Sequence, residues 1–600
     1  MSNILGFTAW FHDSSACLLR DGQLVAFAEE ERFSRRKHTP EYPRRSIEYC
    51  LAEGGLTLDE LDAVVFYMDP RTMIRNNLWY LLRFFPWSLN LFRKSTTVVP
   101  IRERYRNLLN IKPILCREHG AVGRFPLVTL PHYRTHQGAA FLCSPFDDAA
   151  IITMDVAVDG TTQTIAHGKG NRIETVLKHT LPHGWGMLYC AFTRYVGFKF
   201  YDEYKVMGMA AYGRPRYLDF IEERLYRFDD ETGEFQLNLD YFAYQYHGMR
   251  RLWNDRLTRE LGPARDPSRP LEQRDYDLAA SIQAATERFG VRMARLARRL
   301  TGARNLTMAG GVVQNCLMNQ KIIEAGLFDQ VFLQPLASDV GCSLGGALYH
   351  YHCTLGRPRS FVMNHLYWGP DYKDDYRTAL QERGLVFKQV ESPAAEIARA
   401  IAEGMIVGFV CGRMEAGPRA LGARSILADP RRHDMKDILN LRVKHREHFR
   451  PFAPSCLEER MDEVFEPLPG CRSLGYMITT ATVRPEMRPR VPTITHNDGT
   501  ARPQAVSRAT SPLYWEIIHE FDKLTGVPVV VNTSFNDNEP IVCTPQDAIN
   551  CFLRTRIDLL VLENYLVYRK DNEHIIAAAR ERVGVSAGGA GRDVAAGVAP

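Results

Sequence analysis

Alternating apolar and polar positions open the chain and predict three short strands. They cover Ile4–Ala9, Ala16–Arg20 and Gln23–Glu29. The dipeptide Asp21-Gly22 between the last two strands predicts a tight hairpin, because both residues tolerate a positive φ. A polar turn that carries His12 separates the first two strands.

A second copy of this layout begins near Ala149. Strands are predicted over Ile151–Asp155 and Thr162–His167, again with polar turns after them. Two units of strand, polar turn and strand favour a duplicated α/β fold of the actin-like, sugar-kinase-like kind, in which phosphate is held between two halves.

The middle of the chain predicts a long amphipathic helix over Asp275–Leu300 with one apolar face toward the core. A strand over Leu306–Ala309 follows and leads into Gly310 and Gly311, and Asn315 opens the next helix. Glycines at such a turn let phosphate approach the backbone N–H groups, or they answer a packing requirement. Both interpretations stay open.

Further on, the pattern breaks near Phe361–Tyr372, where a domain boundary is expected. A helix over Ala394–Glu403 then leads into an apolar strand, Ile406–Val410. A last strand runs from Val527 into polar residues that could bond oxyanions or simply form a turn.

Composition describes a multidomain globular protein of 600 residues, with 45% apolar and 24% charged residues. The net charge of +5 is too small to indicate nucleic-acid binding. Thirteen scattered cysteines fit a reducing, cytoplasmic setting better than a disulfide framework. The sequence predicts neither a signal segment nor a membrane span.

An aromatic-rich run, Leu78–Phe92, is interrupted by Arg83 and Pro86. It is short for a spanning helix, and we expect a core or lid helix before a membrane-surface or partner helix.

Two histidines four residues apart, His132 and His136, would share one face of a helix. Core or surface histidines also explain such a pair, but Asp155 at a strand end and Asp339 in a later polar turn strengthen the case for metal. Two imidazoles and two carboxylates suit Fe(II), Mn(II) or Zn(II).

A basic stretch follows the Ile406 strand, and glycines and prolines bend it. Its cations are Arg413, Arg419, Arg424, Arg442, Lys444, Arg446 and Arg450. A solvated basic face is one interpretation, but arginines on bent backbone present planar donor forks, which favours an anion-binding site.

These motifs together resemble the O-carbamoyltransferases of antibiotic, nodulation-factor and toxin biosynthesis, the family that includes tobramycin carbamoyltransferase. The resemblance covers nearly the whole chain. Its most specific blocks are Asp202–Gly213, Gly412–Pro430, Arg442–Pro454, Asp498–Arg502 and Asn532–Asn536.

The resemblance implies an α/β enzyme with a duplicated actin-like (ASKHA) domain, similar to TsaD, over residues 1–365. A YrdC-like α/β domain would cover 366–585, before a disordered tail over 586–600. Such enzymes make carbamoyl adenylate from carbamoyl phosphate and ATP with Mg(II), and then carbamoylate a hydroxyl of a secondary metabolite such as a polyketide or glycoside.

The resemblance also implies roles for individual residues. Carbamoyl phosphate and ATP would be bound by Arg419, Lys444, Arg446, Arg450, Arg502, Ser534 and Asn536, with Lys444 and Arg446 also catalytic. Iron(II) would be held by His132, His136, Asp155 and Asp339. Nucleotide on the TsaD-like side would contact Gly310, Gly311 and Asn315. His12 would act as general base on the acceptor hydroxyl, because a neutral imidazole suits that transfer near pH 7.

Two residues depart from the family pattern at the metal site. Val156 replaces a glycine that lets backbone approach phosphate, and Arg134, between the histidines, is expected to contact phosphate instead. The alternatives are a tRNA threonylcarbamoyl-type enzyme, a sugar or acetate kinase with an added domain, and an inactive nucleotide-binding homologue. The expected partner is a small-molecule hydroxyl acceptor near His12 and Leu78–Leu91, with no nucleic acid or membrane. Homodimerisation and the acceptor's identity are left open.

Overall fold

A five-stranded sheet is built from the first strands of the chain. A computed structural model describes residues 1–92 and 101–582. The sheet has the order β3-β2-β1-β4-β5, formed by β1 (Asn3–Thr8), β2 (Ser15–Arg20), β3 (Gln23–Glu29), β4 (Ala63–Phe66) and β5 (Leu127–Thr129). The first three strands are antiparallel, while β4 and β5 run parallel to β1. The predicted hairpin is confirmed, because Asp21 and Gly22 both have positive φ, 49° and 79°.

The second sheet repeats this topology strand for strand. Its order is β8-β7-β6-β11-β12, formed by β6 (Asp148–Met154), β7 (Thr161–Lys169), β8 (Arg172–Thr180), β11 (Asn305–Ala309) and β12 (Gln330–Leu333). Again three antiparallel strands are followed by two parallel ones. The duplicated actin-like α/β fold is therefore confirmed for the first half of the chain.

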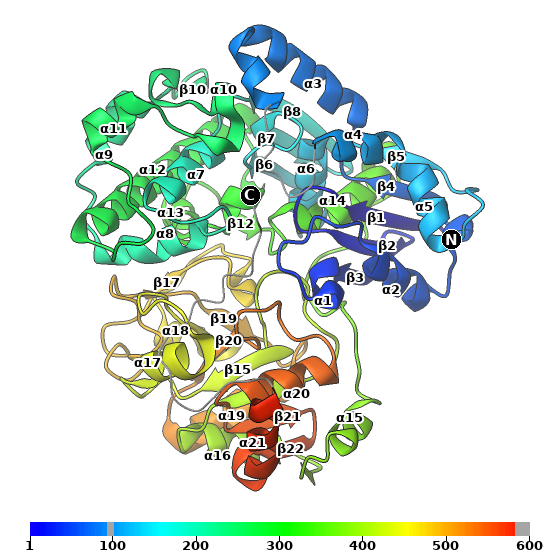
Figure 1. Ribbon diagram of the computed structural model, residues 1–600, viewed down its shortest axis with the longest axis vertical. Helices are drawn as coiled ribbons and strands as arrows, with labels where there is room; N and C mark the ends of the chain where they lie inside the picture. The colour runs from blue at the N-terminus through cyan, green and yellow to red at the C-terminus, as the bar shows by residue number, and fades with distance from the viewer. Residues whose placement is uncertain (93–100, 583–600) are drawn as a thin grey trace.

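Two helices between these sheets hold the halves of the duplication together (Figure 1). They are α6 (His132–Leu142), which follows β5, and α14 (Cys342–Leu348), which follows β12. A Cβ on Gly138 would lie 2.4 Å from the carbonyl oxygen of Gly345, and one on Gly345 would lie 2.0 Å from that of Thr135. Glycine at both positions therefore permits the close approach that brings the α6 histidines beside Asp339.

Helices cover the outer faces of both sheets. The long predicted helix is confirmed as α12 (Gln273–Thr301), and its apolar face is buried. The other main helices of this half are α1 (Glu30–Ser34), α2 (Arg44–Gly54), α3 (Pro70–Arg83), α4 (Ile101–Leu109), α5 (Ile111–His119), α7 (Trp185–Tyr195), α8 (Glu203–Met209) and α13 (Cys316–Glu324).

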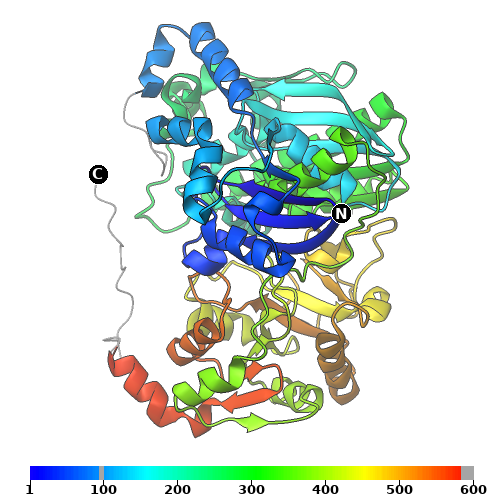
Figure 2. The same cartoon turned by 90° about the vertical axis from the view of Figure 1, so that its right-hand side faces the viewer.

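The rest of the chain builds an eight-stranded mixed sheet with helices against it, seen in the lower part of Figures 1 and 2. Its order is β13-β22-β21-β14-β15-β20-β16-β19, formed by β13 (Lys388–Gln389), β22 (Tyr565–Tyr568), β21 (Leu559–Leu562), β14 (Val407–Val410), β15 (Arg424–Ala428), β20 (Val529–Ser534), β16 (Ala453–Leu457) and β19 (Gln504–Val506). The main helices here are α15 (Tyr376–Glu382), α16 (Ala394–Ala402), α17 (Met435–Leu439), α19 (Pro512–Thr525), α20 (Pro545–Arg554) and α21 (Glu573–Arg582).

Each half has its own apolar core, but the chain does not divide cleanly between them. Residues 471–478 belong to the second half of the sequence, yet Arg472 N donates to Val331 O on β12 and Tyr476 packs in the first core. The predicted border at 365/366 lies between Thr354 and Tyr376, a stretch without helices or strands. The predicted tail, 586–600, lies outside the described residues. No helix of the described ranges is long and apolar enough to cross a membrane.

The aromatic run corrects one expectation. Residues 78–92 do not form a core helix but end α3 and then form the short helical turn η2 (Trp87–Phe92). Trp79, Phe85 and Trp87 are 53%, 66% and 64% exposed, so the core interpretation is wrong. Pro86 has no N–H to donate and so cannot continue α3, which ends at Arg83.

Candidate metal centre and anion-binding pocket

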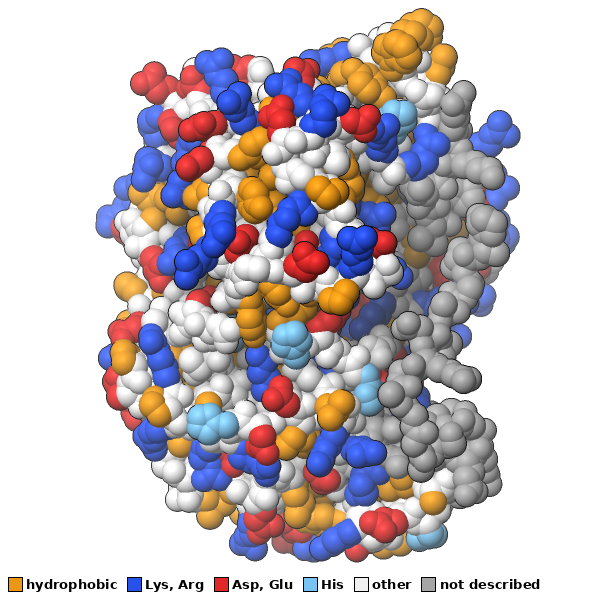
Figure 3. Space-filling view, turned by 60° about the vertical axis from the view of Figure 1, so that its left-hand side comes forward, with side chains coloured by type: hydrophobic (Ala, Val, Ile, Leu, Met, Phe, Trp, Pro, Cys, Tyr) orange, Lys and Arg blue, Asp and Glu red, His pale blue; other side chains and the backbone are white. Residues whose placement is uncertain are grey.

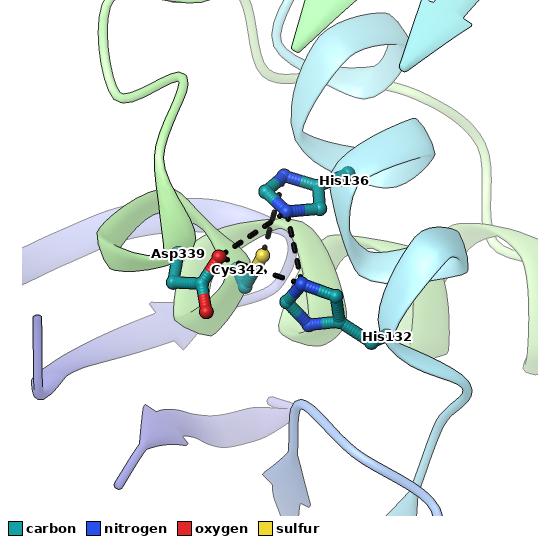
Figure 4. A group of neighbouring side chains, drawn as sticks. All are labelled: His132, His136, Asp339 and Cys342. Atoms are coloured by element: carbon teal, nitrogen blue, oxygen red, sulfur yellow. Dashed lines mark hydrogen bonds and ion pairs between the residues drawn. The ribbon is translucent and has the colours of Figure 1, made fainter. Parts of the chain in front are cut away.

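The first turns of α6 present two imidazoles side by side. His132 begins the helix and His136 lies one turn later, so that their Nε2 atoms are 3.1 Å apart (Figure 4). The buried Asp159 carboxylate accepts the backbone N–H of His132 at 3.1 Å and holds the start of this helix in place.

Two carboxylates from different strand ends face these nitrogens. Asp155 follows β6, and Asp339 opens the short turn η8 (Asp339–Gly341) after β12. The Nε2 of His132 lies 3.4 Å from both Asp155 Oδ2 and Asp339 Oδ1. The Nε2 of His136 lies 3.8 Å and 3.4 Å from the same two oxygens. The structure thus brings all four predicted ligands together.

This donor set fits a metal ion. Ligands bonded to one ion at about 2.1 Å lie about 3.0 Å apart at a right angle and about 3.4 Å apart at the tetrahedral angle. Four of the five observed separations, at 3.1–3.4 Å, fall in that range, and the fifth is 3.8 Å. Asp339 is fully buried, and neither of its oxygens accepts a hydrogen bond from a described residue. A bound cation would satisfy it, and two imidazoles with two carboxylates suit Fe, Mn or Zn.

The charges of these residues suit a bound cation. Burial opposes protonation of His132, yet the nearby Asp339 carboxylate outweighs burial and raises the pKa of this imidazole well above its usual value. Burial alone would raise the pKa of Asp339, but the nearby His132 and His12 have the larger, opposite effect and lower this pKa to about 2. The carboxylate therefore stays ionised and available to a cation at neutral pH.

Cys342 at the start of α14 is a neighbour that the sequence did not single out. Its Sγ, both imidazoles and Asp339 form one group whose ligand atoms lie within 4.8 Å of one another. However, Sγ lies 3.4 Å from the Nδ1 of His136, whereas the Nε2 of the same ring faces Asp339 (Figure 4). We therefore favour Asp155 as the fourth ligand and Cys342 as the group that orients the His136 ring.

His12 lies at the edge of this cluster, in the turn between β1 and β2. Its Nε2 is 3.8 Å from Asp339 Oδ2, and its Nδ1 is 3.4 Å from Asp13 Oδ2. Asp13 also bonds His38 at 2.7 Å, so one carboxylate orients two imidazoles. Burial lowers the pKa of His12, but Asp339 and Asp13 raise it to about 9. A cation held by Asp339 would oppose this rise, and the role of His12 as general base stays a prediction.

Val156 and Arg134, the two residues that differ from the family pattern near the metal site, lie in different surroundings. Val156 does not adopt a positive φ; that conformation falls on Ala157, at 112°, where a side chain is strained. Arg134 is exposed and lies over the Tyr349 ring at 5.9 Å. A residue two positions from His132 and His136 is turned about 200° from their face of the helix. The predicted phosphate contact near the metal is therefore wrong for Arg134.

The second site is a polar cavity of about 480 Å³ beside the end of β20. Lys444, at the end of the π-helical turn η10 (Asn440–Lys444), is buried there, and its Nζ donates to the Ser534 carbonyl and to Asn536 Oδ1 and O at 2.7 and 2.9 Å. Burial and the neighbouring Arg446 hold the pKa of Lys444 well below its usual value. The predicted Lys444, Ser534 and Asn536 are thus in direct contact.

Arg446 and Arg450 line the same cavity. The Arg446 guanidinium donates to Asn440 Oδ1 at 2.8 Å and lies 4.4 Å from the Phe452 ring centre. Arg450 lies over the Tyr204 ring at 4.8 Å, and its nearest carboxylate, Glu447, is 3.8 Å away. Both guanidiniums retain N–H donors that these contacts do not use. Such donors are available to bind an anion.

Arg419 and Arg502 form a neighbouring pair of unneutralised cations. Neither makes an ion pair with a described residue, and the Nε of each is buried without an acceptor. Burial and the neighbouring Arg502 lower the pKa of Arg419 to about 9. Arginine does not lose its proton in proteins, so this shift expresses unfavourable charge crowding that an anion would relieve.

Other arginines of the basic stretch are structural, which narrows the predicted anion site. Arg424 is fully buried and donates to the carbonyls of Cys411, Gly412 and Ala423 at 2.9–3.3 Å. Arg413 pairs with Glu53 of the first half at 3.0 Å. The sequence could not separate these from the site arginines, because all stand in the same pattern.

The first half of the chain completes the pocket with two lysines, of which the sequence marked Lys205 as a possible phosphate contact or a surface residue and did not mark Lys37. Lys37 and Lys205 line the cavity beside Lys444, and Lys205 also pairs with Glu447 at 2.9 Å. Lys37 makes no ion pair or hydrogen bond with a described residue that would neutralise it. Glu29 accepts the backbone N–H of Gly417 at 2.6 Å and so fixes the loop that carries Arg419.

The predicted nucleotide loop has a packing explanation at its first glycine. Gly310 has φ 104°, and a Cβ there would lie 2.2 Å from Met154 O. Gly311 donates its N–H to Asp155 Oδ1 at 3.2 Å and so supports a metal ligand. Asn315 caps α13 through Met318 N at 3.0 Å and bonds Gln283. Nucleotide contact by these residues stays a prediction.

Comparison with known proteins defines the class. The first half matches the family described as "Carbamoyltransferase N-terminus" over residues 3–348, and the second matches "Carbamoyltransferase C-terminus" over 398–569. The chain belongs to the carbamoyltransferase family, and it is a carbamoyl-transferring enzyme. An uncharacterized protein of Synechocystis is 38% identical over 94% of this chain and 97% of its own length. Nodulation protein NolNO of Sinorhizobium fredii is 38% identical over 94% of this chain and 79% of its own, and NolO of Bradyrhizobium diazoefficiens 40% over 73% and 79%.

Solved structures match more distantly. Component A of the (R)-2-hydroxyglutaryl-CoA dehydratase of Acidaminococcus fermentans is 15% identical, covers 59% of this chain and 100% of its own, and has a TM-score of 0.32. HypF of T. kodakarensis is 12% identical, covers 59% and 48%, and has a TM-score of 0.31.

Proposed function

We propose that this carbamoyltransferase is an ATP-dependent O-carbamoyltransferase that works through carbamoyl adenylate. The main support for this proposal is a group of cations in and beside the cavity of about 480 Å³ whose charges are not fully neutralised. They are Lys37, Arg419, Lys444, Arg446, Arg450 and Arg502. Carbamoyl phosphate and ATP are both polyanions. Bringing them into one site requires such a concentration of positive charge.

Adenylation would take place in this cavity. Water releases phosphate from carbamoyl phosphate, a carbamate oxygen attacks the α-phosphorus of ATP, and pyrophosphate leaves. Lys444 and Arg446 would bind the transferred groups, and Arg419, Arg450 and Arg502 would neutralise charge on the leaving phosphates. Ser534 and Asn536 hold the Lys444 ammonium in place through the contacts described above.

Transfer would take place at the cluster of His132, His136, Asp155 and Asp339. These four residues would hold a dication, iron(II) in our proposal, which would supply Lewis-acid chemistry there. The acceptor hydroxyl attacks the carbamoyl carbon, AMP leaves, and the hydroxyl proton passes to His12. Asp13 orients the His12 ring for this step through its contact with Nδ1.

We further propose the domain division 1–365 and 366–585, with a YrdC-like second domain. The acceptor would be a hydroxylated secondary metabolite. Both statements follow the family resemblance and the relatives named as nodulation proteins.

The test is pyrophosphate release from ATP with and without carbamoyl phosphate, in anaerobic iron(II) and without acceptor. We expect release that depends on carbamoyl phosphate. Asp339→Asn should keep this release and lose transfer to a hydroxyl acceptor, whereas Lys444→Met should lose release itself. Arg251→Met, at an exposed arginine paired with Asp255, is the matched control. Pyrophosphate release that ignores carbamoyl phosphate would refute the proposal.

A further inference from the structure

Large apolar side chains stand in water along α3 and η2. The exposed fractions are 56% for Leu78, 53% for Trp79, 68% for Leu82, 66% for Phe85, 64% for Trp87 and 55% for Leu89. In Figure 3 hydrophobic side chains gather at the top of the molecule, where α3 lies in Figure 1. We call residues 74–89 of this segment the apolar ridge.

The apolar ridge is continuous and large. Ile74, Leu78 and Leu82 are spaced four residues apart on α3 and so lie along one side of that helix. Phe85 and Leu89 extend the apolar surface beyond its end. Aromatic side chains offer about 150–250 Å² each, so Trp79, Phe85 and Trp87 alone expose about 300–450 Å². Isolated exposed apolar residues are ordinary, but a patch of this size marks an interaction site.

The opposite side of the segment is firmly attached, so the exposure is not a fraying end. Met73 is buried, and Asn77 Nδ2 donates to Tyr105 OH at 2.7 Å. Ser88 is buried and its hydroxyl donates to Leu81 O at 2.7 Å. The ridge is thus held outward by contacts beneath it.

The charged side chains within the segment itself are all basic. Residues 70–92 contain Arg71, Arg75 and Arg83 and no Asp or Glu. All three arginines are exposed, and none makes an ion pair with a described residue. The Arg83 guanidinium lies over the Trp79 ring at 5.1 Å, so a cation accompanies the exposed aromatics.

These observations separate the candidate occupants. A small ligand is normally enclosed by its pocket, whereas these side chains are more than half in water. In a two-fold contact with a second copy, the three arginines of this segment would face their own copies and repel them. An anionic lipid surface accepts both features, because Trp, Phe and Leu enter the interface while Arg meets the headgroups.

We propose that the apolar ridge docks the enzyme on anionic membrane surfaces. This replaces the expectation of no membrane contact, which rested on the lack of a spanning segment. The ridge is joined to the candidate metal centre, because Asn76 Nδ2 donates to Asp159 O at 2.8 Å and Asp159 caps the helix of His132. Docking would therefore bring the transfer site close to the membrane surface.

The experiment is flotation of the full-length protein with vesicles of phosphatidylcholine alone or mixed with phosphatidylglycerol. We expect flotation with the mixed vesicles only, together with a blue shift of tryptophan fluorescence as Trp79 and Trp87 leave water. The combined Leu82→Ser, Phe85→Ser and Trp87→Ser variant should lose vesicle partitioning by about ten-fold or more. The combined Arg71→Gln, Arg75→Gln and Arg83→Gln variant should lose the preference for anionic lipid.

Leu524→Ser removes an equally exposed leucine, 55% exposed, in the second half of the chain and should float like the wild type. Because the changed side chains point into water, an unchanged thermal midpoint should accompany each variant. Wild-type protein that stays unbound with mixed vesicles would overturn the proposal. So would a serine variant that floats unchanged, or self-association that the serine variant abolishes without any lipid binding.

Discussion

Arg419→Met should make the ligand-free enzyme more stable while weakening anion binding. The residue is half-buried, its Nε has no acceptor, and Arg502 lies close enough to disfavour its charge. Methionine retains most of the aliphatic packing and removes the charge. A residue that only supported the fold would show the opposite sign, since losing it would destabilise the enzyme.

The magnitude follows from the crowding. Burial and Arg502 lower the pKa of Arg419 from 12.5 to about 9, and one pKa unit corresponds to about 1.36 kcal/mol. The upper limit is therefore about 4–5 kcal/mol of unfavourable free energy on the charged form. Water and counter-ions at a half-buried guanidinium reduce this, and we expect a gain of about 1–2 kcal/mol in the free energy of unfolding.

The assay is urea unfolding at low salt with and without inorganic pyrophosphate. At a pyrophosphate concentration of about 100 Kd, the wild type should gain about 2.7 kcal/mol, whereas Arg419→Met should gain little. Arg251→Met, which breaks an exposed ion pair with Asp255, serves as the control and should change neither quantity beyond about 0.5 kcal/mol. Arg419→Met protein that is less stable without ligand, or equally stabilised by pyrophosphate, would refute the reasoning.

Three further predictions concern the two sites. Asp339→Asn should lower the affinity for iron(II) at least about ten-fold, because a buried anionic ligand is lost; metal analysis after anaerobic loading checks this, and full metal content would contradict it. Phosphate binding should be accompanied by proton uptake at Lys444. Burial and Arg446 lower the pKa of Lys444 in the free enzyme, and a bound anion would raise it again. The affinity for phosphate should therefore increase as the pH falls toward the pKa of Lys444 in the free enzyme. Calorimetry in two buffers of different ionisation enthalpy measures this uptake, and Lys444→Met should abolish it. Lys37→Ala should raise the KM for carbamoyl phosphate about ten-fold with little change in stability, since Lys37 is exposed in the free pocket; an unchanged KM would exclude it from the site.

Predictions from local sequence patterns were confirmed where the structure depends only on residues close together in the chain. The hairpin at Asp21-Gly22, the amphipathic α12 and the Asn315 cap each depend on residues a few positions apart. Such periodicity and turn chemistry are set by backbone geometry, so they survive without knowledge of the fold. The duplicated strand units also reported the sheet topology, because each unit forms the same three-stranded meander.

The prediction of a core helix for the aromatic run, Leu78–Phe92, was wrong because burial depends on more than the local pattern. Apolar content predicts burial only if another layer covers it, and nothing in residues 78–92 states that no layer does. Similarly, Arg424 and Arg419 stand five residues apart in one basic stretch. Arg424 donates from Nη1 to three backbone carbonyls, whereas Arg419 makes no ion pair with a described residue. Their difference lies in neighbours that are distant in the sequence.

The sequence by itself determined the fold class, the spacing of the two histidines on one helix and the family to which the chain belongs. The tertiary structure alone decided that Asp155 and Asp339, 184 residues apart, meet those histidines at 3.4–3.8 Å. It also decided that Lys37 reaches the cavity of Lys444 and that the apolar ridge faces water. The physical reason is that helix and turn geometry act over a few residues, whereas ligand sets and exposed surfaces arise only when distant strands and helices pack.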